Sequence, residues 1–155
     1  MTEVHFYHLR GQRLERVLPL LLERSLQRGW RCAVQMASEE RMTAVDEALW
    51  TYADESFLAH GTPREGDADL QPVYLTTATD NPNGAAVRMF LEGTEALPVL
   101  QRSDAAAYQR AMVIFDGADA DQLAGARAQW AALKSAGHDV TYWQQDEDGR
   151  WEKKA

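Results

Sequence analysis

The sequence of 155 residues contains little cysteine, no long apolar run and no excess of positive charge. Its single cysteine, Cys32, can form no disulfide within the chain. No apolar run approaches the roughly 20 residues that a membrane-spanning helix needs. The first ten residues, MTEVHFYHLR, lack the basic and apolar regions of a signal peptide. We therefore expect a cytoplasmic protein that makes no contact with a membrane.

The formal net charge of −8 argues against general binding of nucleic acid. Neutralising phosphates requires clustered lysine and arginine, and an acidic surface repels a polyanion. A small local basic patch is still compatible with this charge. If the protein acts on DNA, we expect its contact with the DNA to be indirect, through another protein.

The motifs of the common nucleotide-binding and hydrolytic sites are also missing. There is no G-x-x-x-x-G-K-[ST], and the first expected strand is followed by LRGQRLERV rather than G-x-G-x-x-G. No G-x-S-x-G provides a nucleophile. His5 and His8 are three residues apart on an expected strand, so they point to opposite faces and cannot share a metal. Cys32 has apolar neighbours and is interpreted as a buried, inert thiol. We expect no cofactor and no metal.

The sequence does contain strand and helix patterns in alternation, within a length that suits one domain, residues 1–155. This order predicts a three-layer α/β/α sandwich with a mainly parallel sheet. Pro19 is an objection to a helix that starts well before it. The polar tail from about residue 146 is expected to fray. Strands are predicted at 4–9, 31–36, 72–78, 86–93, 108–117 and 139–145, and helices at 13–30, 38–50 and 119–137.

Three aspartates, Asp116, Asp119 and Asp121, surround the end of one expected strand and the start of the last helix. The carboxyl end of a strand is where ligands of α/β proteins bind, so an acidic site is conceivable. Capping of the helix N-terminus, together with a favourable interaction with the helix dipole, also explains why aspartates occur here, and it is the favoured interpretation.

The stretch DEALWTYADESFLAHG is unusually rich in large apolar side chains for a turn. On an ideal helix Trp50 lies about 100° from the inward stripe of Met42, Val45 and Leu49. Phe57 follows in the turn. The segment either folds back over the edge of the sheet, which spacing alone favours, or exposes an apolar surface for a partner.

A second aromatic group lies on the last expected helix. Arg127, Trp130 and Lys134 project within about 60° of one another. A ring between two cations suits a peptide that ends in an apolar side chain and a carboxylate. However, Trp130 is also close to the inward face defined by Leu133, and spacing alone narrowly favours a core position.

Several runs together resemble one known family. They are FYHL, GWRCAVQMASEERMTAVDEALWTYADESFLAHG, PVYLTT with NPN, and RAQWAALKSAGHDVTYWQQ. In this order they are similar to the chi subunit of bacterial DNA polymerase III, a clamp-loader accessory subunit. The pairing of DEALW with SF-x-x-H is the most specific part. The resemblance implies a Rossmann-like sandwich without a phosphate loop, and a protein that is not itself an enzyme.

The resemblance also implies partners and site residues. Such proteins link the clamp loader to the single-stranded-DNA-binding protein by binding its acidic C-terminal tail, which ends in an apolar residue. They use a second surface for a small subunit, psi, or for an accessory helicase. The tail site would fall on Arg127 and Trp130. Ala131 stands where relatives carry a lysine, and Lys134 is the candidate to supply that charge. The psi or helicase surface would fall on Trp50 and Phe57. The alternative is a small nucleotide-binding enzyme on the same sandwich.

Overall fold

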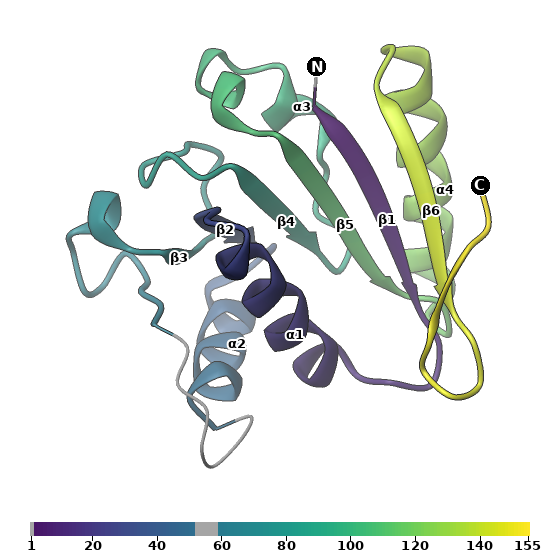
Figure 1. The fold of residues 1–155 in the computed structure, drawn as a ribbon, viewed down its shortest axis with the longest axis horizontal. Helices are drawn as coiled ribbons and strands as arrows, with labels where there is room; N and C mark the ends of the chain where they lie inside the picture. The colour runs from purple at the N-terminus through teal and green to yellow at the C-terminus, as the bar shows by residue number, and fades with distance from the viewer. Residues whose placement is uncertain (1, 52–58) are drawn as a thin grey trace.

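The computed structural model describes residues 2–51 and 59–155, which form a mixed α/β domain (Figure 1). A sheet of seven strands has the order β3-β2-β4-β5-β1-β6-β7, and every pair is parallel except β6 with β7. The predicted three-layer sandwich with a mainly parallel sheet is thus confirmed. The strands are β1 (Glu3–Leu9), β2 (Cys32–Gln35), β3 (Val73–Thr76), β4 (Val87–Leu91), β5 (Arg110–Asp116), β6 (Asp139–Gln145) and β7 (Trp151–Lys153). The helices are α1 (Leu14–Gln27), α2 (Glu39–Thr51), α3 (Leu97–Leu100) and α4 (Ala120–Ser135), with short 3-10 turns at Ala68–Leu70 and Ser103–Ala107.

Two apolar clusters fill the space on the two sides of the sheet. Side chains of α1 and α2 pack with Leu9, Val34 and Met89 on one side. Side chains of α3 and α4 pack with Phe6 and Phe90 on the other. Figure 1 shows α1 in front of the sheet and α4 behind it. Alternate residues of the central strands therefore serve opposite layers, as expected for a parallel sheet that is buried on both faces.

Helix α1 continues through Pro19, so the objection from the sequence does not hold. The helix begins at Leu14, which places Pro19 in its interior, where one backbone hydrogen bond is missing. The proline ring is buried, together with Leu18 and Leu22 on the same helix. Packing of this apolar stripe against the sheet outweighs the lost hydrogen bond. Gly29, with a positive φ of 81°, follows the helix as the predicted stop.

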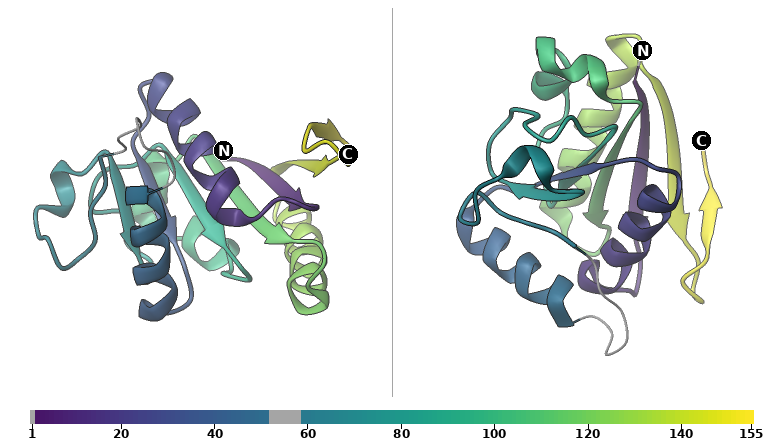
Figure 2. Two further views of the ribbon diagram at one scale, coloured as in Figure 1. Left: turned by 90° about the horizontal axis from the view of Figure 1, so that it is seen from below. Right: turned by 60° about the vertical axis from the view of Figure 1, so that its left-hand side comes forward.

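The tail from residue 146 is ordered by a β-hairpin, which differs from the fraying predicted from its polar composition. Strand β7 pairs with β6 at the edge of the sheet (Figure 2). The connecting turn is held by Asp146, whose side chain accepts hydrogen bonds from the backbone N–H groups of Asp148 and Arg150 at 2.9 Å. Trp151 packs edge-on against Tyr7, with 5.1 Å between the ring centroids.

Within the described residues, no helix is long and apolar enough to cross a bilayer.

Candidate functional site

Helix α4 carries the three residues of the predicted tail site, here called the α4 patch: Arg127, Trp130 and Lys134. Arg127 and Lys134 are exposed, and Trp130 is half-buried. The Nζ atom of Lys134 lies 5.4 Å from the centroid of the Trp130 ring, which is within cation–π range. Helical periodicity therefore brings the three side chains onto one face, as the sequence indicates.

Trp130 belongs to the core and to the surface at once. Its ring meets Phe6 edge-on at 5.5 Å and Tyr142 edge-on at 5.6 Å, between centroids. These contacts join it to the apolar cluster behind the sheet. The residue as a whole is only partly exposed. Trp130 is thus a partly buried residue that packs against the core, and its role in binding stays a prediction.

Tyr142 and His8 extend the α4 patch onto the sheet, and sequence reasoning missed both in this role. The hydroxyl of Tyr142 on β6 is 2.8 Å from Nδ1 of His8 on β1. The His8 ring also packs against Phe115, at 5.0 Å between centroids. The local pattern marks these residues only as strand residues. They meet because β6 pairs with β1 in parallel, and a local sequence pattern does not specify that pairing.

The charge of Arg127 affects the pKa values of both His8 and Tyr142. Burial lowers the pKa of His8, and the nearby Arg10 and Arg127 lower it further, while Asp116 acts in the opposite direction. Burial raises the pKa of Tyr142, and Arg127 opposes that shift. His8 is therefore neutral at pH 7, and the Tyr142 hydroxyl keeps its proton. The positive charge of the site comes from Arg127 and Lys134.

Gly117 leaves room for the His8 ring. A Cβ atom on Gly117 would lie only 1.8 Å from Nε2 of His8, so no other residue fits there without moving the ring. His5, three residues earlier on β1, faces the α1 side, where it lines a pocket with Arg24. The prediction that His5 and His8 point to opposite faces is confirmed.

Asp119 caps the start of α4. Its side chain accepts hydrogen bonds from the N–H groups of Asp121 and Gln122 at 3.0 Å. The carboxylate of Asp116 accepts one from the N–H of Ala118 at 2.9 Å, in the loop before the helix. The capping interpretation is confirmed for Asp119, and Asp121 lies in the first turn of the helix. Among the described residues, no three His, Cys, Asp or Glu side chains form a group that could hold a metal.

Cys32 is buried on β2, as predicted. Burial raises the pKa of its thiol to about 12, while a hydrogen bond with Ser25 acts in the opposite direction. A thiol with this pKa carries almost no thiolate at neutral pH and is a poor nucleophile.

Trp50, the predicted docking residue on α2, is exposed over 51% of its surface. Its ring lies against that of His60, with 4.5 Å between the centroids. His60 is buried, and its Nε2 is 2.8 Å from a carboxylate oxygen of Asp46. Phe57, the other residue predicted for this surface, lies outside the described residues. The predicted pairing of Trp50 with Phe57 thus stays a prediction.

Comparison with known proteins adds two findings. The family model described as "DNA polymerase III chi subunit, HolC" matches residues 1–141. A curated protein of Rickettsia prowazekii (strain Madrid E), described as "Probable DNA polymerase III subunit chi", is 23% identical over 117 residues. That match covers 75% of this chain and 71% of the relative. Both findings agree with the family resemblance of the sequence runs.

Proposed function

Because this chain belongs to the DNA polymerase III chi subunit family, we propose that it is a non-catalytic, cytoplasmic accessory subunit of the polymerase. In this role it links the clamp loader to the single-stranded-DNA-binding protein. The observation that carries the proposal is the α4 patch, in which a partly exposed tryptophan lies beside two exposed cations. Its contact with DNA is indirect, which suits a chain with a net charge of −8.

The α4 patch matches the chemistry of an acidic peptide tail with an apolar last residue. Arg127 can form two parallel hydrogen bonds with the terminal carboxylate, since its guanidinium presents two N–H groups in a plane. Trp130 offers the apolar side chain a surface already fixed by Phe6 and Tyr142. Ala131 provides no cation. Lys134, already placed over the Trp130 ring, supplies a second charge for the acidic residues of the tail.

A second surface, around Trp50, is proposed for psi or for an accessory helicase. An exposed tryptophan is a common anchor of protein interfaces. Phe57 is included in this surface on the basis of the family resemblance alone. Because α2 and α4 cover opposite faces of the sheet, both partners could bind at the same time.

Tail binding is tested by substituting Arg127. Arg127→Ala should weaken binding of an acidic, Phe-ended peptide by about 1–3 kcal/mol, because one partner of a charge-assisted contact is lost. Isothermal titration calorimetry of the full chain measures this difference. Arg16→Ala, an exposed arginine on α1, is the matched control and should bind like wild type.

The same titration with a C-terminally amidated peptide identifies the group that Arg127 binds. If Arg127 contacts the terminal carboxylate, amidation weakens binding to wild type and has little further effect on Arg127→Ala. Salt should likewise weaken the wild type more than the variant. The proposal fails at this site if the free-acid peptide gives no saturable signal, or if Arg127→Ala binds it like wild type.

A further inference from the structure

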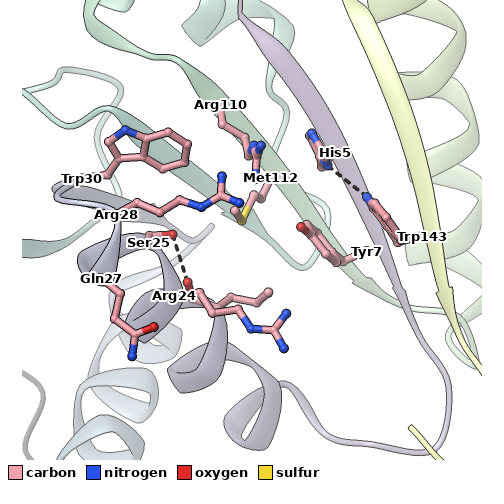
Figure 3. A pocket seen from close by; sticks show the side chains of 11 residues that line it. His5, Tyr7, Arg24, Ser25, Gln27, Arg28, Trp30, Arg110, Met112 and Trp143 are labelled. Atoms are coloured by element: carbon pink, nitrogen blue, oxygen red, sulfur yellow. Dashed lines mark hydrogen bonds between the residues drawn. The ribbon is translucent and has the colours of Figure 1, made fainter. Parts of the chain in front are cut away.

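A pocket of about 430 Å³ lies on the α1 side of the sheet, away from the α4 patch. Arg24 and Arg28 reach it from the end of α1, and Arg110 reaches it from the first residue of β5. Figure 3 shows Arg28 and Arg110 beside Trp30, with His5 and Trp143 across the pocket. This space, here called the arginine pocket, falls within the usual volume range of small-molecule sites, about 300–1,000 Å³.

The three guanidinium groups are poorly neutralised. None of the described residues that line the pocket is acidic. Over residues 2–51 and 59–155, neither Arg24 nor Arg28 forms an ion pair. Arg110 has one long contact, 3.5 Å, to Glu3, whose side chain is half exposed. In a chain with a net charge of −8, three such cations at one pocket form a local positive field.

Structural roles explain only part of this cluster. Arg24 and Arg28 at the C-terminus of α1 interact favourably with the helix dipole. The Arg28 guanidinium also lies 5.1 Å from the Trp30 ring centroid, and that of Arg110 lies 5.4 Å from it. However, Nε of Arg110 is buried and has no hydrogen-bond partner among the described residues. A buried donor without an acceptor costs about 1–3 kcal/mol, so the packing of Arg110 against Trp30 leaves a cost that these structural roles do not explain.

All three arginines affect the pKa of Tyr7, which also lines the pocket. Burial raises the pKa of Tyr7, and Arg110, Arg24 and Arg28 all oppose that shift. Burial also lowers the pKa of His5, and Arg110 lowers it further, while Glu3 and Asp139 act in the opposite direction. His5 is therefore neutral at pH 7. Its Nδ1 atom accepts a hydrogen bond from Nε1 of Trp143 at 2.9 Å, which holds the tryptophan ring in place.

We propose that the arginine pocket binds a nucleotide, with its phosphates on Arg24, Arg28 and Arg110 and its base against the partly exposed ring of Trp143. Phosphate is favoured over carboxylate, because three guanidinium forks need more acceptor oxygens than one carboxylate offers. An aromatic side chain at the opposite wall provides a stacking surface for a base. The nucleotide is either free or the terminal nucleotide of a single strand, since both carry the same chemistry. A strand end bound here would add a direct contact to the indirect contact with DNA proposed for the α4 patch.

The test is a titration of the full chain with ADP, inorganic pyrophosphate and adenosine. ADP should bind more tightly than pyrophosphate, and adenosine should bind weakest, because only ADP uses both the cations and the ring. Arg24→Gln and Arg28→Gln should each weaken ADP binding by about tenfold, as expected for one lost charge-assisted contact. Both residues are exposed, so the variants should fold. Arg16→Gln on the same helix is the matched control.

A titration with 5′-phosphorylated oligothymidylate distinguishes a free nucleotide from the terminal nucleotide of a single strand. If the strand end is the ligand, the oligonucleotide binds more tightly than ADP and loses affinity without its 5′-phosphate. Chelation of magnesium should not weaken binding, because none of the described residues that line the pocket carries a carboxylate to hold a metal. Arg127→Ala should leave nucleotide binding unchanged, so failure here and failure of tail binding can be told apart.

Three results would overturn the inference. The first is the absence of saturable binding by ADP, pyrophosphate and the oligonucleotide. The second is equal affinity for ADP in wild type, Arg24→Gln and Arg28→Gln. The third is loss of acidic-peptide binding in Arg24→Gln or Arg28→Gln, which would assign the arginine pocket to a peptide.

Discussion

Arg88 shows, at the scale of single residues, how a charge is buried without an ion pair to any carboxylate in the part of the chain that the structure describes. Its side chain on β4 is fully buried. It donates to the carbonyl oxygens of Ala78 and Asp80 at 2.7 Å and to the Tyr108 hydroxyl at 2.9 Å. It also donates to Oε1 of Gln35. These neutral acceptors tie the loop after β3 to the centre of the sheet.

Replacing Arg88 should therefore destabilise the whole domain. Arg88→Met fills a similar volume but leaves the Gln35 side chain and two loop carbonyls without their donor. The expected loss in free energy of unfolding is about 3 kcal/mol or more. Urea denaturation followed by circular dichroism measures it.

Arg102→Met is the control for Arg88→Met. Arg102 is exposed and pairs with Asp104 at the surface, with 3.0 Å between the charged atoms. Surface pairs contribute little, so its change should stay within about 1 kcal/mol. Equal midpoints for Arg88→Met and wild type would mean that the loop does not depend on this network.

Residues of the candidate site differ in how far the sequence can place them. Arg127, Trp130 and Lys134 share a face because of helical periodicity alone, so their proximity is predictable. His8 cannot be placed from local pattern, because its partner Tyr142 is distant in the sequence. Nor does composition reveal the packing of its ring against Gly117. Local spacing thus identifies the helical half of the site and misses the half on the sheet.

At the scale of elements, the strand and helix patterns locate most of the fold. The predicted strand 31–36 is observed as Cys32–Gln35, and the predicted helix 38–50 as Glu39–Thr51. The backbone N–H of Arg41 donates to the Ser38 hydroxyl, as a helix cap should. By contrast, the polar composition of the run DEDGRWEKKA does not predict strand β7, which lies within it. Its order depends on the Asp146 turn and on packing of Trp151 against distant Tyr7, which periodicity does not report.

The β6–β7 hairpin should therefore depend on Trp151. Trp151→Ala removes the edge-on contact with Tyr7 and should lower the free energy of unfolding by about 2 kcal/mol. The amide of Lys154, which donates to the carbonyl of Tyr142 at 2.8 Å, should lose its protection from hydrogen exchange.

Lys153→Ala provides the comparison for this hairpin, because Lys153 is exposed on the same strand. It should leave both stability and exchange nearly unchanged. If Lys154 exchanges as fast in wild type as in Trp151→Ala, the tail frays as its composition suggests.

At the scale of the whole molecule, the sheet separates two positively charged sites in an acidic chain. The α4 patch lies behind the sheet, and the arginine pocket lies on the α1 side. Each site contains a histidine of β1 whose burial lowers its pKa, His8 in one and His5 in the other. Strand β1 thus places one titratable histidine in each site.

This arrangement predicts how stability depends on pH. The unfolded chain protonates both histidines near the ordinary pKa of about 6.5. The folded chain resists protonation, because the pKa values of His5 and His8 are lowered. Below that pH the unfolded state binds more protons than the folded state, so the free energy of unfolding falls as the pH falls. It should decrease between pH 7.5 and pH 5.5, a window above the titration of ordinary carboxylates.

The contribution of the two histidines is measured from the slope of stability against pH. Urea denaturation midpoints at several pH values across this window give the slope for wild type, His5→Gln and His8→Gln. Each variant should have a shallower slope, whatever its absolute stability, because glutamine does not titrate. Since the two side chains face opposite layers, their effects on the slope should add in the double variant. A variant whose slope equals or exceeds that of wild type would contradict the lowered pKa of the histidine that it lacks.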